Sequence, residues 1–309
     1  MQFELEGGLS MRLRRSELST PASSERMIAK AAASAADLVF LDLEDSVAPS
    51  EKVGARAKVI HALQTLDFGK KTRAVRINDL ETEYAYQDVI SIVEEAGDRL
   101  DIIIIPKIKS GRDVWWVDLL VTQIEKRLRR SKPIGLEAQI EEVEALQCVE
   151  EIAKSSPRLE ALIFGPYDYA ASQGVDPRAI EEDSSLYEGD IWHYARNKIV
   201  IAARAAGIDA IDGPFIDYQN AEGFRRACVR VRTLGFSGKW AIHPSQIELA
   251  NGVFAPSDND IAWARTLDAL YKEAQAKGLG AVTYEGKMVD VALIRNARNI
   301  IQKADLIGK

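Results

Sequence analysis

The sequence has 309 residues, of which 47% are hydrophobic and 28% are charged. These values are ordinary for a globular protein in water, and the length leaves room for one large domain or two small ones. The net charge of −7 and the isoelectric point of about 5.3 exclude a broad basic surface, so nucleic acid is not an expected partner.

Nothing in the sequence suggests secretion or a membrane. The two cysteines, Cys148 and Cys228, lie outside any metal-binding or redox spacing, which favours a cytoplasmic protein with reduced thiols. The first sixteen residues contain no apolar segment of the kind that a secretory signal needs. The most apolar run, DIIIIP at 101–106, is far too short to span a bilayer.

Apolar runs of about five residues alternate with amphipathic stretches of helical period, a pattern that is typical of repeated strand–helix units. Eight such units over about 250 residues predict a (β/α)8 barrel. An open doubly wound sheet is the alternative, but no glycine-rich fingerprint follows a first strand. We expect strands at roughly residues 12–19, 37–42, 72–77, 101–106, 133–139, 160–165, 208–211 and 239–242.

Capping residues mark the expected helices. Ser23 or Ser24 begins a helix that runs to about Ala35, and Pro49-Ser50 begins the next. The eighth strand ends near residue 242, which predicts a barrel domain over 1–255 and a helical extension over 256–309. Within the extension we expect one helix from Pro256-Ser257 to about Lys277 and another over roughly 287–306. Such an extension packs outside the barrel, acts as a lid or reaches a neighbouring subunit.

Several predicted strands end in charged residues, and the carboxyl ends of barrel strands all open onto the face that carries the active site. Glu141 and Asp168 lie 27 residues apart, about one strand–helix unit, near the ends of the fifth and sixth strands. Two carboxylates so close would repel each other unless a cation or a shared proton compensates. They are candidate ligands of Mg²⁺, which takes one or two protein carboxylates; the alternative is a pair of solvated loop acids.

Arg76 ends the third strand, where a guanidinium can bind a carboxylate or stabilise a developing enolate oxygen. It is equally suited to be a structural partner of Glu44 or Asp45, which follow the second strand. Because consecutive strand residues point in opposite directions, we expect one of these acids to bind Arg76 or a metal-bound water and the other to cap the next helix. Asp42 is a third candidate for the same role.

Other polar residues at strand ends are weaker candidates. Lys107 and His243 end the fourth and eighth strands and can donate to a substrate oxygen, although a lone histidine is more often structural. Asp212 orients a neighbour or turns the chain. The first helix and the segment before it hold a basic group that suits phosphate or belongs to a solvated surface. Its members are Arg12, Arg14, Arg15, Arg26 and Lys30.

The chain resembles the HpcH/HpaI aldolase superfamily, which includes the citrate lyase β-subunit and malyl-CoA lyases. The segments that carry the resemblance span almost the whole chain in order, and LDLEDSVAP with the long extension is most similar to the L-malyl-CoA/β-methylmalyl-CoA lyase subgroup. They are RSELSTPASSERM, ADLVFLDLEDSVAPSEK, RAVRIND, IIIPKI, GLEAQIEE, LEALIFGPYDYAAS, DAIDGPF, GKWAIHPSQ and GKMVDVALI.

The resemblance implies a (β/α)8 barrel that forms a homotrimer or homohexamer and uses Mg²⁺ or Mn²⁺ with a coenzyme A thioester. It implies that Glu141 and Asp168 bind the metal and that Arg76 contacts glyoxylate or the acyl group. The basic N-terminal segment would lie at the coenzyme A site, with Arg15, Ser23, Arg26 and Lys30 as the expected contacts.

The resemblance also implies substrate contacts from the sixth strand end and a residue on the lid. Pro166, Tyr167 and Asp168 belong to the matching motif GPYD and are expected at the substrate. Asp290 in the GKMVD motif would lie on a lid that closes over a neighbouring subunit's site, as a general acid–base. The catalytic set expected from the sequence is therefore Arg76, Asp290, Glu44 and Asp45.

The expected reaction is a metal-dependent, reversible aldol-type cleavage of L-malyl-CoA to acetyl-CoA and glyoxylate, or of β-methylmalyl-CoA to propionyl-CoA and glyoxylate. The alternatives are a malyl-CoA thioesterase, a citramalyl-CoA lyase, a citrate lyase β-subunit that acts on an acyl carrier protein, and a non-catalytic scaffold. Two departures from the family pattern leave the acyl group open. Ala22 replaces a usual glycine, and the segment 175–190 is short.

Overall fold

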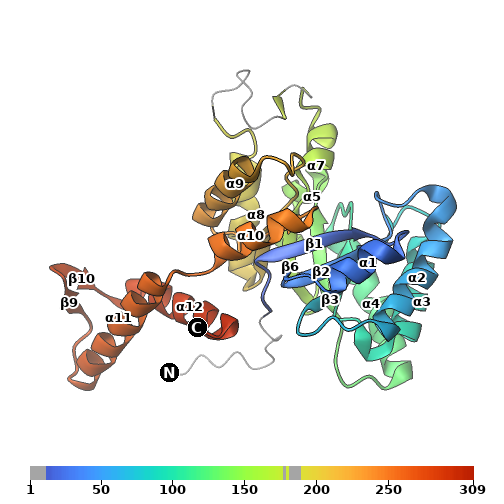
Figure 1. Ribbon diagram of the computed structural model, residues 1–309. Coiled ribbons are helices and arrows are strands. Elements are labelled where there is room, and N and C mark those ends of the chain that lie inside the picture. Colours follow the sequence, from blue (N-terminus) through green and yellow to red (C-terminus); the bar gives the residue numbers. More distant parts are fainter. Residues whose placement is uncertain (1–11, 177–178, 181–188) are drawn as a thin grey trace. The chain divides into compact units, whose positions relative to one another are not determined.

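Eight parallel strands close into a barrel in the described part of the chain, and helices alternate with them along the sequence (Figure 1). The computed structural model describes residues 12–176, 179–180 and 189–309. Each strand pairs with the next one along the chain, and β1 pairs with β8 to complete the ring. The strands are β1 Ser16–Pro21, β2 Leu38–Asp42, β3 Thr72–Arg76, β4 Ile102–Ile105, β5 Gly135–Ile140, β6 Leu159–Phe164, β7 Asp209–Asp212 and β8 Gly238–Ala241.

The helices cover the outside of this ring. They are α1 Glu25–Ala32, α2 Lys52–Thr65, α3 Ala85–Ala96, α4 Gly111–Leu128, α5 Val143–Gln147, α6 Val149–Ile152, α7 Pro166–Gln173, α8 His193–Ala206, α9 Ala221–Leu234 and α10 Ile247–Phe254, with 3₁₀ turns at Pro49–Glu51, Gly97–Arg99 and Pro244–Gln246. The predicted (β/α)8 barrel is thus confirmed. Ser24 caps α1, as one of the two expected residues, and accepts the Met27 N–H at 3.4 Å.

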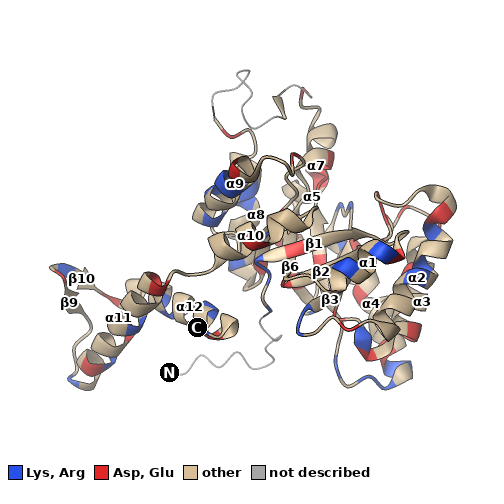
Figure 2. Ribbon diagram, in the orientation of Figure 1, with Lys and Arg blue, Asp and Glu red and all other residues tan. Residues whose placement is uncertain are grey.

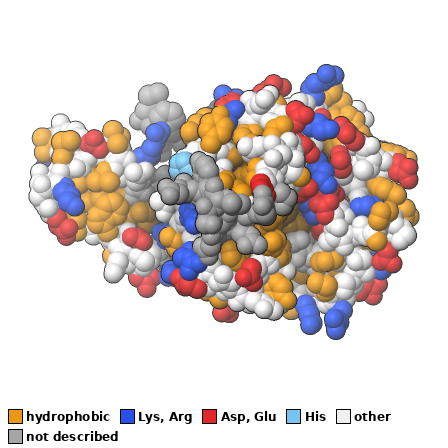
Figure 3. All heavy atoms as spheres, turned by 90° about the horizontal axis from the view of Figure 1, so that it is seen from above, with side chains coloured by type: hydrophobic (Ala, Val, Ile, Leu, Met, Phe, Trp, Pro, Cys, Tyr) orange, Lys and Arg blue, Asp and Glu red, His pale blue; other side chains and the backbone are white. Residues whose placement is uncertain are grey.

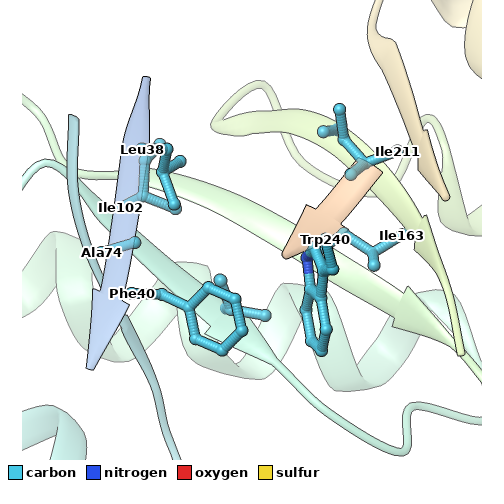
Figure 4. Packing of buried hydrophobic residues seen from close by; sticks show 9 residues of the cluster. Leu38, Phe40, Ala74, Ile102, Ile163, Ile211 and Trp240 are labelled. Atoms are coloured by element: carbon cyan, nitrogen blue, oxygen red, sulfur yellow. The ribbon is translucent and has the colours of Figure 1, made fainter. Parts of the chain in front are cut away.

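Strand alternation fills the inside of the barrel with apolar side chains. Phe40 of β2, Ala74 of β3, Ile104 of β4, Ile163 of β6 and Trp240 of β8 belong to one fully packed cluster (Figure 4). Every second residue of a strand shares that inward direction, so residues two positions further along point toward the same axis near the carboxyl ends. This alternation determines which polar side chains point toward the barrel axis at the mouth.

The amino-terminal end of the barrel is closed by a buried ion cluster around Arg14. Its guanidinium donates to Glu137 Oε1 at 2.6 Å, also bonds Glu160, and lies 3.7 Å from Asp209. Only 3% of Arg14 is exposed. Burial alone would lower the pKa of Arg14, but the surrounding carboxylates raise it, so the group stays charged.

Strand β1 begins later in the sequence than predicted. The strand starts at Ser16 rather than near residue 12, because Arg12, Arg14 and Arg15 turn toward acids of neighbouring strands. Arg12 donates to Glu160 at 2.9 Å. These three arginines therefore lie at the end of the barrel opposite its carboxyl-terminal mouth.

Asp101, directly before β4, gives a prediction about stability in acid. Burial alone would raise its pKa, but bonds from Arg73 and Lys132 outweigh that effect and lower the pKa to about 2. A carboxyl whose pKa is lower in the folded state contributes stability above its unfolded pKa near 3.8 and loses it as the pH falls toward 2. We expect Asp101→Asn to be destabilised at pH 6, with the gap to the wild type shrinking below pH 4. Urea unfolding at pH 6, 4 and 3 measures this, and a gap that is independent of pH would contradict it.

Residues 252–309 form a second compact unit, distinct from the unit of residues 1–251. Helices α11 Asp258–Ala276 and α12 Val291–Ile307 pack around Ala264, Leu267 and Ile294, and a hairpin of β9 Val282–Tyr284 and β10 Lys287–Val289 joins them. The predicted start of the last helix at residue 287 is wrong. Residues 287–289 pair as a strand, because Glu285 and Gly286 adopt the left-handed backbone of a tight turn.

The surface carries charges of both signs. Figure 3 shows one face, on which basic and acidic side chains are interspersed with apolar ones. Some of these opposite charges form exposed ion pairs, such as Lys109 Nζ with Glu81 Oε1 at 2.7 Å. Among the residues with described structure, no helix is both long and apolar enough to cross a bilayer.

Candidate active site

Arg76 and Asp42 form the centre of the barrel mouth. Each lies two residues beyond an inward core residue, Ala74 or Phe40, and their strands are paired in register at these positions. Arg76 Nε donates to Asp42 Oδ1 and Nη2 to Oδ2, both at 2.7 Å, in a bidentate pair. Burial alone would raise the pKa of Asp42, but Arg76 holds it below its ordinary value. Both groups are therefore charged although they are almost fully buried.

Glu44 and Asp45 both turn back onto the same arginine. Asp42 Oδ1 accepts the Glu44 N–H at 3.0 Å, which bends the chain just after β2. Arg76 Nη1 then lies 3.0 Å from Glu44 Oε2 and 3.6 Å from Asp45 Oδ2. The expectation that one of these acids caps the next helix is wrong, because the strand ends at Asp42 and its alternation no longer separates the two side chains.

Lys107 completes this ion cluster. Its Nζ bonds Glu44 and lies 3.0 Å from Asp45 Oδ1. Burial raises the pKa of Glu44 to about 7 although Arg76 and Lys107 oppose it, and the neighbouring Asp45 raises it further. Lys107 also has a left-handed backbone, with φ of 47°, which is uncommon for a residue with a side chain. Strain of this kind is found at functional sites.

Glu141 lies beside the cluster, at an inward position four residues after Glu137 on β5. It is fully buried, and its Oε1 accepts the Lys107 N–H at 2.8 Å. The Gln139 amide bonds its other oxygen. The pKa of Glu141 is raised well above its ordinary value, first by burial and then by the charge of Asp168, while Arg76 opposes the rise. A carboxylate in this place needs a cation to hold its charge.

The donor set suits a hard divalent ion. Asp168 lies in the first turn of α7, is partly exposed, and interacts with Glu141 through its charge. No hydrogen bond or ion pair joins the Asp168 carboxylate to any residue that the structure describes. Two neighbouring carboxylates match the one or two protein ligands that Mg²⁺ takes while water or substrate fills the other positions. The described residues contain no group of three or more potential metal ligands of the Asp, Glu, His and Cys types.

Gly165 makes room for Glu141 at the end of β6. A Cβ atom built on Gly165 would lie 2.4 Å from Glu141 Oε2 and 2.6 Å from Glu141 Cβ, closer than real atoms approach. Gly165→Ala is therefore expected to displace Glu141 and lower kcat by about 10²-fold, because a shift of about 1 Å at a reacting centre has that effect. Steady-state kinetics of Gly165→Ala checks this. Gly54→Ala, within α2, is the control for glycine substitution, because no atom lies within 4 Å of the added Cβ and the φ of Gly54 is not positive. Full activity in Gly165→Ala would contradict the steric argument.

The loop after β1 brings a second group of predicted residues to the mouth. Ser23 lies there, with its carbonyl accepting Lys58 Nζ at 2.8 Å, and Arg26 and Lys30 lie one turn apart on the exposed face of α1. Arg15 does not join them. It precedes β1 at the other end of the barrel, where Asp37 binds it through 2.7 Å bonds to Nε and Nη2. The placement of Arg15 at a thioester site is thus corrected.

Ala22, in place of a usual glycine, causes no backbone strain. Its φ is not positive, its side chain is fully buried, and its N–H donates to the Asp42 carbonyl at 3.0 Å. The methyl group therefore points into the protein. A need for positive φ at this position is therefore excluded.

Pro166 and Tyr167 line a cavity of about 390 Å³. Its walls come from the loops after β6 and β7 and from the first turns of α8 and α9, including Phe215 and Trp192. Arg226 and Arg230 of α9 also line it. Figure 2 shows that α9 carries several basic residues. The cavity lies directly beside the chain segment that carries Asp168.

The weaker candidates separate into two groups. Asp212 points away from the barrel axis and bonds Arg196 Nε at 3.0 Å and Lys239, so it orients neighbours, as one of the two expectations for it. His243 lies at the end of β8, stacks on Tyr218 with ring centres 4.8 Å apart, and its Nδ1 lies 2.8 Å from Ser245 Oγ. The His243 ring therefore contacts Tyr218 and Ser245.

Asp290 belongs to the second unit and is the N-cap of α12. Its Oδ1 accepts the N–H groups of Ala292 at 3.0 Å and Leu293 at 3.2 Å. The exposed side chains of Met288 and Val291 flank it. The structure of this unit thus gives Asp290 a local role in starting a helix.

Sequence reasoning missed Gln139 and Gly165. Gln139 was recognisable, since it lies two residues before Glu141 on the same strand and so shares its inward direction. Gly165 carried no such signal, because its importance depends on the distance to another strand. The bidentate partner of Arg76 was named only as a third candidate, Asp42.

Comparison with known proteins places this site in a family. Residues 15–244 match the family HpcH/HpaI aldolase/citrate lyase, which covers most of the chain. The chain belongs to the HpcH/HpaI aldolase/citrate lyase family. This result agrees with the barrel, with the mouth cluster and with the resemblance seen in the sequence.

Members of this family that resemble the chain include two named enzymes. The L-malyl-CoA/beta-methylmalyl-CoA lyase of Cereibacter sphaeroides (strain ATCC 17025 / ATH 2.4.3) is 48% identical over 100% of both chains. The citrate lyase subunit beta of Leuconostoc mesenteroides subsp. cremoris is 35% identical over 95% of this chain and 94% of that protein. Identity is therefore higher to the L-malyl-CoA/beta-methylmalyl-CoA lyase than to the citrate lyase subunit.

A solved structure of the family supports the same placement. The protein CitE from Mycobacterium tuberculosis, in complex with magnesium, acetoacetate and coenzyme A, is 29% identical with a TM-score of 0.74. The match covers 94% of this chain and 97% of that one.

Proposed function

We propose that the protein is a metal-dependent carbon–carbon lyase that cleaves L-malyl-CoA reversibly to acetyl-CoA and glyoxylate, and β-methylmalyl-CoA to propionyl-CoA and glyoxylate. The observation that carries the proposal is the pairing of Glu141 and Asp168 beside Arg76 at the barrel mouth. The full-length identity of 48% to a named L-malyl-CoA/beta-methylmalyl-CoA lyase supports the choice of substrate.

Glu141 and Asp168 would hold the Mg²⁺ or Mn²⁺ ion. When bound, the ion supplies Lewis-acid polarisation of the substrate's C–O bond. The two carboxylates differ in exposure, because Glu141 is fully buried and Asp168 is partly exposed. Gln139 and the Lys107 N–H fix the Glu141 carboxylate from behind, which leaves the exposed side of the pair toward the substrate.

Cleavage requires that the substrate hydroxyl loses its proton, the bond between the hydroxyl-bearing carbon and the α-carbon of the thioester breaks, and its electron pair forms a thioester enolate. Arg76 stabilises that enolate. Asp42 occupies the Nε and Nη2 edge of the guanidinium, so the enolate would approach Nη1, where it would compete with the Glu44 carboxylate 3.0 Å away. Protonation of the enolate carbon then gives acetyl-CoA or propionyl-CoA.

Arg26, Lys30 and Ser23 are proposed to bind the phosphates of coenzyme A. They follow β1 and lie on the first loop and helix at the mouth, where two exposed cations stand one turn apart. The cavity beside Pro166 and Tyr167 provides space next to Asp168 for substituents of the substrate. Glu44 and Asp45, held by Lys107, tune the charge around Arg76 rather than contact the substrate.

Asp290 is proposed as the group that takes up the hydroxyl proton when the extension acts as a lid. Asp290→Asn is expected to lower kcat by about 10²-fold or more, since general acid–base catalysis contributes that much. It should leave the melting temperature unchanged, because asparagine caps a helix as well as aspartate does. Kinetics and thermal unfolding of Asp290→Asn measure both effects. Asp258→Asn, in the first turn of α11, is the matched control, and unchanged kcat in Asp290→Asn would remove the residue from the mechanism.

The decisive experiment for the function is product analysis. The purified protein with Mg²⁺ is given L-malyl-CoA, β-methylmalyl-CoA and citramalyl-CoA, while glyoxylate, pyruvate, free malate and free coenzyme A are measured separately. Glyoxylate together with an intact acyl-CoA is the expected result. Free coenzyme A with malate would identify a thioesterase, pyruvate would identify a citramalyl-CoA lyase, and no turnover would favour a substrate on an acyl carrier protein.

The assembly and location also belong to the proposal. We infer a homotrimer or homohexamer from the family resemblance, and light scattering coupled to size-exclusion chromatography measures it. A cytoplasmic location stays a prediction, because neither Cys148 nor Cys228 belongs to a metal-binding or redox spacing.

A further inference from the structure

Glu17 is a buried acid that the proposed reaction does not use. It occupies an inward position of β1, is 0% exposed, and lies opposite Trp240 in the pairing of β1 with β8. Trp240 Nε1 donates to Glu17 Oε2 at 2.9 Å. The other oxygen, Oε1, accepts no hydrogen bond from any residue in the described structure. The indole is thus the direct partner of this carboxyl group.

The same indole supports the active-site arginine. The Arg76 guanidinium carbon lies 5.4 Å from the ring centre of Trp240, within the range of a cation–π contact. The Phe40 ring lies 4.4 Å from the Trp240 ring at an angle of 42°. Figure 4 shows the Trp240 side chain next to Phe40 inside the barrel, with its indole nitrogen on the strand side. Only 4% of Trp240 is exposed.

We propose that Glu17 is a positioning residue, which fixes the Trp240 indole by its hydrogen bond and thereby holds the Arg76 guanidinium in its reactive orientation. This inference rests on the proposed function, in which Arg76 stabilises the enolate. Glu17 itself does not touch the substrate.

Two residues, Asp42 and Trp240, hold the Arg76 guanidinium in place. Asp42 binds Nε and Nη2 of Arg76 and so fixes the guanidinium within its own plane. The Trp240 ring limits its movement out of that plane. The indole needs the Glu17 bond, because a buried N–H without an acceptor is destabilising and the ring would turn to find one. The contact sequence Glu17, Trp240, Arg76 therefore reaches from the interior of the barrel to its mouth.

The surroundings of Glu17 favour its uncharged form. Burial raises its pKa well above the ordinary value, and the negative charge of Glu137 raises it further, while Arg14 and the Trp240 bond oppose the rise. A protonated carboxyl keeps a carbonyl oxygen for the indole N–H. Glutamine has nearly the same shape and the same acceptor, which makes Glu17→Gln a conservative replacement.

The test compares Glu17→Gln, Glu17→Leu, Trp240→Phe and the double variant Glu17→Leu/Trp240→Phe with L-malyl-CoA at saturating Mg²⁺. Glu17→Leu removes the acceptor, and Trp240→Phe removes the N–H but keeps a ring beside Arg76. Each is expected to lower kcat about 10-fold to 10²-fold with KM almost unchanged, the size of effect that misplaced reacting groups produce. Glu17→Gln should keep the wild-type kcat. The double variant should be no slower than Trp240→Phe alone, since both changes break one bond.

A second readout does not depend on the reaction. In protein with ¹⁵N-labelled arginine, the Nε–H resonance of Arg76, identified by its loss in Arg76→Lys, should be sharp in the wild type and in Glu17→Gln. It should broaden in Glu17→Leu. If the wild type cleaves no malyl-CoA, the proposed function fails while this spectrum still decides the inference. Wild-type kcat in Glu17→Leu or in Trp240→Phe, multiplicative losses in the double variant, or an unchanged Arg76 resonance would each overturn it.

Discussion

Replacing Asp168 with asparagine is expected to abolish the magnesium-dependent cleavage of L-malyl-CoA. The change keeps the shape of the side chain but removes one of the two charges that would hold the ion. Even groups behind a metal's direct ligands affect affinity or activity by about 10-fold to 10²-fold, so loss of a ligand should lower kcat by at least about 10²-fold. Folding should be unaffected, because no described residue forms a hydrogen bond or ion pair with Asp168. Binding of Mn²⁺ measured by electron paramagnetic resonance, alongside kcat, tests the assignment.

The control for this experiment is Glu142→Gln. Glu142 directly follows the proposed ligand Glu141 and is partly exposed, and its side chain makes no capping bond to α5. It should bind Mn²⁺ and turn over substrate as the wild type does. A metal-loaded Asp168→Asn enzyme with full activity would reject Asp168 as a ligand.

The second large effect is expected from Arg76→Met. Removing the guanidinium leaves Asp42 buried without its bidentate partner and leaves Glu44 with Lys107 alone. Breaking a buried ion pair from one side costs about 3–5 kcal/mol of unfolding free energy. Because Arg76 is proposed to stabilise the enolate, kcat should also fall by about 10²-fold or more. Chemical denaturation and steady-state kinetics of the same variant measure the two losses.

The double variant Asp42→Asn/Arg76→Met separates the structural role from the catalytic one. Neutralising Asp42 removes the uncompensated charge, so much of the unfolding free energy that Arg76→Met loses should return. The kcat should stay low, because no guanidinium faces the enolate. Recovery of activity together with stability would show that Arg76 acts only as a partner of Asp42.

The strand–helix rhythm of the sequence was enough to predict the barrel. Eight apolar runs buried on both faces have few other solutions, and the carboxyl ends of parallel strands must share one face. For that reason Glu141, Asp168, Arg76, Glu44 and Asp45 were correctly expected to lie near strand ends at one mouth. The interactions among Glu44, Asp45 and Lys107 were not predictable, since they depend on a loop that bends after Asp42 and on the left-handed backbone of Lys107.

The prediction that Arg15 lies at the coenzyme A site was wrong, because it rested on charge alone. A run of arginines before a strand and a helix resembles a phosphate site, but the sequence does not show on which side of the strand the run lies. β1 separates the two ends of the barrel, so Arg15 before it and Arg26 after it lie at opposite ends. The hairpin before α12 was missed for a similar reason, because three paired residues give too short a pattern to distinguish a strand from a helix start.

The ion cluster around Arg14 has a kinetic consequence. With that end closed and the interior filled by packed side chains, reactants reach Glu141 only from the mouth. In the proposed site, a thioester bound over the first loop would cover the small acid beneath it. In the synthetic direction glyoxylate would then have to bind before acetyl-CoA, and in the cleavage direction acetyl-CoA would have to leave first. The enzyme is expected to follow a compulsory order, with acetyl-CoA acting as a dead-end inhibitor whenever it arrives at an empty barrel.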